Sequence, residues 1–199
     1  MKISFPFFLF ILGFLELVAC KDKTKSIYEG CCGTEPTTDA FLVHADTFDN
    51  QGNLIDTAFK ANVLIPNLFV PGTDYPNSWN TTFRIGFGPG IFQVASAVYS
   101  SPDGEILFKR EFFLPDQDDL TDGWDGKKSD GSYFYGVFNY RVVIEFIDGQ
   151  TKVYSSNACS YKCGENGFPV ENVPFCLFPS QNNGNGLPDQ TQPGDSWCF

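Results

Sequence analysis

Residues 133–155 read YFYGVFNYRVVIEFIDGQTKVYS, two runs of β-branched and aromatic residues that are separated by Asp148-Gly149. Such side chains favour extended strands because their branched or flat shapes fit a pleated surface. Asp-Gly supplies the left-handed backbone conformation that a tight reversal needs. The pattern therefore predicts a β-hairpin with strands at residues 133–147 and 151–155.

The preceding part of the chain has the same character. Residues 38–48 alternate as a half-buried strand does, with Phe41, Val43 and Ala45 on one face. Turn residues follow at 49–53, and Asp103-Gly104 marks a second hairpin. Further strand candidates are residues 59–65, 82–87, 92–99 and 105–113. Short strands at this spacing, without a helical period, predict an all-β fold, an antiparallel β-sandwich over residues 38–158.

The first residues have the layout of a bacterial export signal, which we assign to residues 1–19. Lys2 precedes an apolar run that is shorter than the roughly 20 residues needed to span a bilayer. Residues 17–20, LVAC, resemble the bacterial lipobox, in which the cysteine is diacylated and becomes the first residue after cleavage. Several acyl chains hold a protein on a membrane stably. We expect lipid attachment at Cys20 and a membrane anchor; the alternative is an ordinary signal with an incidental cysteine.

The charge of the chain excludes one class of partner. The formal net charge is −11, and removing residues 1–19 leaves it unchanged because Lys2 and Glu16 cancel. Binding to phosphate backbones needs clustered lysine and arginine. We therefore expect no nucleic-acid partner.

Cysteines indicate how the domain is stabilised. Of the seven cysteines, Cys20 is assigned to the lipid, which leaves six: Cys31, Cys32, Cys159, Cys163, Cys176 and Cys198. An even number in an exported chain predicts disulfides. Because a bridge between the adjacent Cys31 and Cys32 would be strained, we expect each to reach a different cysteine near the C-terminus. A metal site that includes Cys159 and Cys163 is the alternative.

These assignments give four regions. Residues 1–19 are the signal peptide, residues 20–37 a polar tether, residues 38–158 the sandwich, and residues 159–199 a cysteine-containing C-terminal extension. The extension is rich in proline, asparagine and glycine. We expect it to be irregular and held by disulfides rather than by a core of its own.

Three segments in the middle of the chain resemble one family when they are taken in order. They are LIPNLFVPGTDYPN at 64–77 with TFRI at 82–85, VYSSPDGEILF at 98–108, and GWDG at 123–126 with SDGSYFY at 129–135. Together they resemble the gliding-motility-associated C-terminal domain of Bacteroidota, over about residues 63–155.

The resemblance implies an Ig-like β-sandwich and a place at the cell envelope. In that family the domain commonly ends cell-surface proteins and is read as a sorting signal by the type IX secretion system. Here residues 156–199 follow the matching part, the lipobox gives a separate export route, and the acidic turn is altered at residues 74–78. We therefore carry over the fold and not the sorting function.

Several residues are candidates for a functional site. Trp124 before Asp125-Gly126 suits packing across the mouth of the sandwich, with a binding surface as the alternative. His44 is the only histidine, and we expect it on the surface of a strand. Thr57 lies in Asp56-Thr57-Ala58, which resembles the O-glycosylation motif of Bacteroidota.

An acidic stretch before Trp124 is a weak calcium candidate. Carboxylate oxygens suit Ca²⁺, but the stretch lacks the spacing of an EF-hand loop, so a solvated loop is favoured. The candidate ligands are Asp116, Asp118, Asp119 and Asp122.

The leading hypothesis is a non-enzymatic lipoprotein of the outer membrane that is a protein-binding or accessory subunit, with no cofactor. Which face of that membrane carries it stays open. A second hypothesis is a glycan-binding or adhesive lipoprotein that uses aromatic residues near Trp79 and Trp124 as sugar platforms. A third is a hydrolase, which needs two carboxylates about 5–9 Å apart in a pocket.

Overall fold

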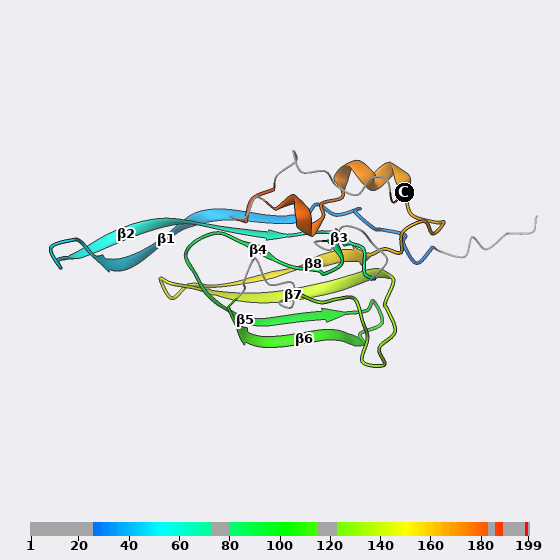
Figure 1. The fold of residues 1–199 in the computed structure, drawn as a ribbon, viewed down its shortest axis with the longest axis horizontal. Helices are drawn as coiled ribbons and strands as arrows, with labels where there is room; N and C mark the ends of the chain where they lie inside the picture. Colours follow the sequence, from blue (N-terminus) through cyan, green and yellow to red (C-terminus); the bar gives the residue numbers. More distant parts are fainter. Residues whose placement is uncertain (1–25, 73–79, 115–122, 183–185, 189–197, 199) are drawn as a thin grey trace, which may run out of the picture.

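The computed structural model describes residues 26–72, 80–114, 123–182, 186–188 and 198. Their strands form two sheets, as Figure 1 shows. The smaller sheet has the order β1-β2-β4 and the larger one β3-β8-β7-β5-β6. Their bounds are β1 (Thr37–Phe48), β2 (Leu54–Ile65), β3 (Leu68–Phe69), β4 (Gly86–Phe87), β5 (Ile91–Ser100), β6 (Ile106–Phe113), β7 (Gly136–Phe146) and β8 (Thr151–Ser160). The predicted all-β sandwich is confirmed.

The hairpin predicted at residues 133–155 is the centre of the larger sheet. β7 and β8 pair antiparallel from Gly136↔Ser160 to Glu145↔Thr151, and β5 pairs with the other side of β7. β7 alternates buried and less buried residues along its length, since one face packs into the core. β3 joins the edge of β8 as a short parallel pair.

Aromatic rings fill one end of the core between the sheets. Trp124 is buried, and its ring lies 5.1 Å from that of Phe138 and 5.4 Å from that of Phe69, measured between centroids. Its indole Nε1 donates to the carbonyl of Lys127 at 2.8 Å. A buried tryptophan usually satisfies its N–H in this way. The packing role predicted for Trp124 is confirmed.

Two strands differ from the predicted ranges: the strand predicted at residues 151–155 is longer in the structure, and the one predicted at residues 82–87 is shorter. β8 runs to Ser160, because residues 158–160 are buried although turn-like and cysteine-containing sequence follows. Residues 82–87 contribute only β4 and an isolated bridge between Phe83 and Trp124. Beyond β8, the described C-terminal extension contains two 3₁₀ helices, η3 (Val170–Phe175) and η4 (Pro179–Gln181).

One carboxylate links the two sheets. Asp39 on β1 accepts from Lys152 Nζ at 2.9 Å and from the Tyr154 hydroxyl at 2.8 Å, both on β8. Burial alone would raise the pKa of Asp39, but these two donors outweigh it and hold the pKa below its usual range. Lys152 also lies 3.1 Å from the centre of the Phe41 ring. This contact fixes the position of β1 over the larger sheet.

We predict that Asp39→Asn lowers the free energy of unfolding by about 1 kcal/mol at neutral pH. Because the pKa of Asp39 is lower in the folded chain than in the unfolded one, its contribution is complete above the unfolded pKa of about 3.9. That contribution is lost as the pH falls through the folded value. Urea unfolding across a pH series should therefore show the full difference from wild type at neutral pH, and a difference that shrinks as the pH falls below about 3.9.

Glu111→Gln is the matched control, because Glu111 pairs with Lys109 on β6 while both side chains are about half exposed. We expect this variant to change stability by less than about 0.5 kcal/mol. Equal effects of the two substitutions would contradict the role given to Asp39.

Candidate functional site

The segment before β1 is folded, in contrast to the tether predicted for residues 20–37. Residues 27–32 form turns, and Tyr28, Cys31 and Cys32 are buried. Ser26 Oγ donates to the carbonyl of Gly167 at 2.6 Å. The folded domain therefore includes residues 26–36. The polar composition of this segment suggests a tether, but Tyr28 packs in a core and Cys31 and Cys32 form disulfides. Residues 20–25 lie outside the described residues.

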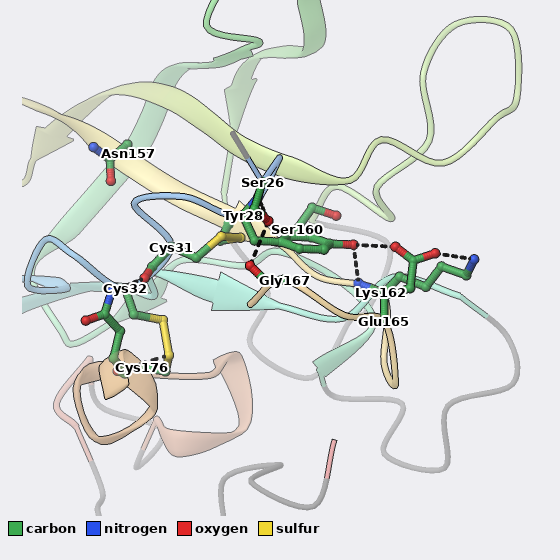
Figure 2. Close-up of a disulfide and its surroundings, with 12 residues drawn as sticks. Ser26, Tyr28, Cys31, Cys32, Asn157, Ser160, Lys162, Glu165, Gly167 and Cys176 are labelled. Carbon is green, nitrogen blue, oxygen red and sulfur yellow. Dashed lines mark hydrogen bonds and ion pairs between the residues drawn. A yellow bond between two sulfur atoms is a disulfide. The ribbon is translucent and has the colours of Figure 1, made fainter. Parts of the chain in front are cut away.

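Tyr28 ties this segment to the C-terminal extension, as Figure 2 shows. Its ring meets that of Tyr161 edge-on, at 4.9 Å between centroids. Its hydroxyl donates to Glu165 Oε2 at 3.0 Å, while Lys162 Nζ donates to the other oxygen of Glu165 at 2.6 Å. Donation from Lys162 and then from Tyr28 holds the pKa of Glu165 below its usual range. Burial raises the pKa of Tyr28.

Three disulfides hold the same region, two of them drawn in Figure 2. Cys31 pairs with Cys159 and Cys32 with Cys176, which confirms that the adjacent cysteines reach different partners. The third bridge joins Cys163 to Cys198. The two bridges from the N-terminal segment have sequence separations of 128 and 144 residues. In the entropy model the first of these bridges to close contributes about 4–5 kcal/mol, and the second, which then closes a loop of under about 20 residues, adds about 3 kcal/mol.

The bridges also remove the predicted alternative of a cysteine metal site. All six sulfurs are in disulfides, and the part of the chain that the structure describes holds no group of three or more histidine, cysteine, aspartate or glutamate side chains placed for a metal. Cys159 belongs to β8, so the C-terminal extension begins after Ser160.

A second small core surrounds these disulfides, which we call the cysteine cluster. Its buried members are Tyr28, Cys31, Cys32, Leu68, Val70, Cys159, Tyr161, Phe168, Phe178 and Cys198. The C-terminal extension supplies four of them, of which Tyr161, Phe168 and Phe178 are aromatic, so it is held by apolar packing as well as by disulfides. This corrects the expectation that cysteines alone hold it.

Asn67 connects three segments that meet beside the cysteine cluster: the chain before β1, the end of β8 and the C-terminal extension. Its side-chain amide donates to the carbonyls of Thr34 and Phe175, both at 2.9 Å, and its Oδ1 accepts from Leu177 N at 2.7 Å. Its own carbonyl accepts from Cys159 N at 2.9 Å. Asn67 is 1% exposed, so each of these bonds replaces one that water would make.

A shallow groove of about 540 Å³ lies beside this cluster. Ile27, Pro102, Phe134 and Val137 are among its lining residues, and Gly136 forms part of its floor. Gly136 has a φ of +117°, and a Cβ there would lie 2.9 Å from the carbonyl oxygen of Ile27. The lining includes one carboxylate, Glu29. The groove therefore does not supply the pair of acids that the hydrolase hypothesis requires.

The outer half of the β1–β2 hairpin, residues 44–58, extends beyond the other strands, and we call it the arm (Figure 1). Its root is fixed: the ring of Phe41 lies 4.8 Å from that of Phe146, and Val43 is fully buried. Gly90 has a φ of +88°, and a Cβ there would lie 2.4 Å from Val43. β4 pairs with β2 only at Val63 and Leu64. Within the described chain, the arm is therefore a two-stranded ribbon.

The turn at the end of the arm is held by Asp49. Its carboxylate accepts from the backbone N–H of Gln51 at 2.9 Å, and from both the backbone and the side chain of Asn53 at 2.8 and 3.0 Å. Donation from Asn53, through its side chain and then its backbone, holds the pKa of Asp49 below its usual range. The turn is thus fixed without help from the rest of the domain.

Apolar side chains are exposed next to this turn. Phe48 is 72% exposed, and Leu54, directly opposite on β2, is 59% exposed. Ile55 is 43% exposed on the other face of the ribbon. Single exposed apolar residues are ordinary, whereas this pair is adjacent and stands at the end of a projecting element.

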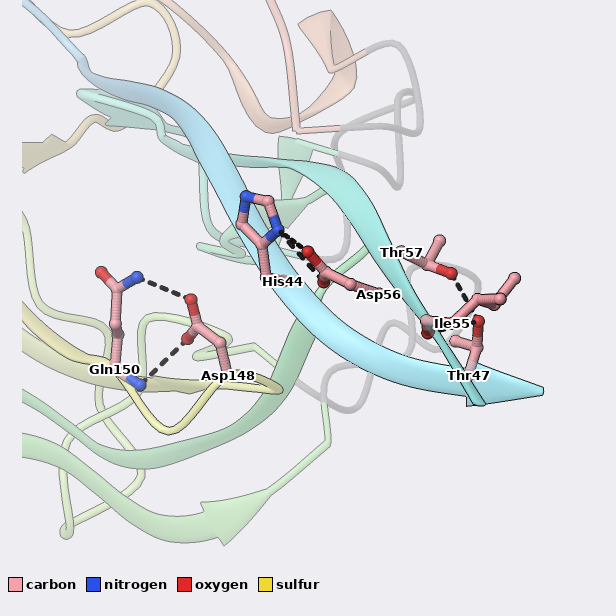
Figure 3. A network of polar contacts seen from close by, with 7 residues as sticks. All are labelled: His44, Thr47, Ile55, Asp56, Thr57, Asp148 and Gln150. Carbon is pink, nitrogen blue, oxygen red and sulfur yellow. Dashed lines mark hydrogen bonds and ion pairs between the residues drawn. The ribbon is translucent and has the colours of Figure 1, made fainter. Parts of the chain in front are cut away.

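Polar groups lie behind this apolar end, as Figure 3 shows. His44 Nδ1 lies 3.0 Å from Asp56 Oδ2, and both side chains are more than half exposed. The surface position predicted for His44 is confirmed. Thr57 faces the other side of the ribbon, where its hydroxyl bonds to that of Thr47. Glycosylation at Thr57 stays a prediction.

Other predicted site residues are not brought to a described surface. The ring of Trp124 is in the core, so it cannot be a sugar platform; Trp79 lies outside the described residues. Cys20 and the calcium candidates Asp116, Asp118, Asp119 and Asp122 also lie outside them. Among the residues that are described, no helix has the length and apolar character needed to cross a bilayer.

Comparison with family models, curated proteins and solved structures finds no match to this chain.

We predict that Asn67→Ala lowers the free energy of unfolding by about 2–3 kcal/mol, because two carbonyls and one N–H lose their buried partner. Asn62→Ala is the matched control, since Asn62 is also buried but its Oδ1 makes no hydrogen bond with the described residues. We expect the control to cost less than about 1 kcal/mol. Denaturant unfolding of oxidised protein measures both, and equal losses would contradict the connecting role of Asn67.

Proposed function

We propose that this protein is a non-enzymatic lipoprotein of the bacterial outer membrane, tethered through Cys20, that binds a protein partner as an accessory subunit of the cell envelope. The lipobox-like residues 17–20 and the net charge of −11 support the anchor and the absence of nucleic acid from its function. The three disulfides support an oxidising compartment outside the cytoplasm.

One observation carries the binding role: the arm projects from the sandwich at the end opposite the first described residues (Figure 1). Ser26 lies beside Gly167 near the cysteine cluster, while Phe48 and Leu54 lie at the far end of β1 and β2. A domain tethered near Ser26 would present the arm away from its anchor. That polarity suits an adaptor which is held at one end and binds at the other.

We predict that the wild-type chain, expressed with its signal peptide, incorporates labelled palmitate and fractionates with membranes. Cys20→Ser should abolish the label, because no thiol remains at position 20 to be acylated. Lys23→Ser is the control and should keep the label. Wild-type protein without fatty acid would contradict the proposed anchor.

The partner and the membrane face are tested on the same cells. A C-terminal affinity tag on the acylated protein should recover one reproducible protein partner from detergent-solubilised membranes, and protease treatment of intact cells reports the face. Repeated capture without an enriched protein would contradict the accessory-subunit role.

A further inference from the structure

We propose that the end of the arm is the partner-binding site, and that it enters an apolar cleft on a protein whose rim carries lysine or arginine. This inference rests on the proposed function, which it makes specific. Three features of the arm carry it: a fixed turn, an exposed apolar pair, and three carboxylates in a stretch that contains no lysine or arginine.

The fixed turn prepares the apolar pair for binding. Phe48 and Leu54 are opposite one another and flank residues 49–53, whose conformation the Asp49 carboxylate holds through three hydrogen bonds. Binding therefore does not have to order this loop. Rigid apolar groups bind with a smaller entropic cost than groups that become ordered on binding.

The carboxylates define the chemistry of the partner. Asp46 and Asp56 are directly opposite across the ribbon, where like charges repel. His44 pairs with Asp56, and the histidine carries a charge only when it is protonated. Residues 44–58 hold the carboxylates of Asp46, Asp49 and Asp56 and no lysine or arginine. A basic group of the partner beside Phe48 would relieve this repulsion.

The same charges argue against other occupants. A second copy would bring an arm with identical carboxylates, on a chain that also carries a net charge of −11. An anionic lipid surface would be repelled for the same reason. A protein with an apolar cleft and a basic rim satisfies both the apolar pair and the carboxylates.

The test places a photo-crosslinking side chain at Asn50, an exposed residue of the turn, in the full acylated chain in the cells that make it. Ser129, an exposed residue of the turn between Lys128 and Ser132, is the control position. We expect a protein adduct from position 50 and not from position 129. The crosslinked peptide of the partner should come from an apolar surface bordered by lysine or arginine.

Two sets of variants separate the contributions. Phe48→Ser with Leu54→Ser should reduce the adduct roughly tenfold or more, whereas Phe92→Ser with Ile106→Ser, at similar exposures of 58% and 60% away from the arm, should leave it unchanged. Asp46→Lys should reduce it as well, by repelling the basic rim. Unchanged thermal unfolding confirms that the variants fold.

The outcomes distinguish this inference from the proposed function. An adduct with a second copy or with lipid overturns the inference, as does an adduct insensitive to the arm variants. If position 50 gives no adduct while the affinity tag still recovers a partner, the arm is not the site and the accessory-subunit role stands. If neither method recovers a protein, both proposals fall.

Discussion

The disulfide between Cys31 and Cys159 joins the segment before β1 to the C-terminal end of β8. Much of the structure depends on that connection. It brings the beginning of the smaller sheet to β8 of the larger one, across a separation of 128 residues. Because Asn67 also bonds to Cys159 N, β3 is fixed against the same part of β8. The C-terminal extension then has a surface on which to pack.

This arrangement leaves one end of the smaller sheet unconstrained. Near the cysteine cluster, β1 and β2 are fixed by disulfides and by the Asp39 contacts, and Phe41 and Val43 complete the root of the arm. Beyond that root, the residues that the structure describes hold the ribbon through its own cross-strand pairs and the Asp49 turn. An isolated two-stranded ribbon is marginally stable in water. The fixed root therefore matters because it supports an arm that the core does not cover.

The strands were predictable because burial on one face imposes a period of two, which β1 and β7 both show. The pairing of Cys31 and Cys32 with different cysteines was predictable from strain, although which cysteines they reach was not. The length of the arm was not predictable, since the alternation in residues 38–48 is the same within the core and beyond it. The role of Asn67 was also hidden, because an asparagine after a proline suits a turn as well as a buried amide.

The proposed anchor and the arm together set a distance from the membrane. Between Cys20 and Ser26 the chain can span at most ~20 Å, so acylation would keep the cysteine cluster close to the bilayer. The twelve residues of β1 extend about 40 Å from that end. A net charge of −11 disfavours lying flat on anionic lipid, which favours orientations in which the arm points away. The short link and the long ribbon would thus place Phe48 and Leu54 where a partner separate from the membrane surface can reach them.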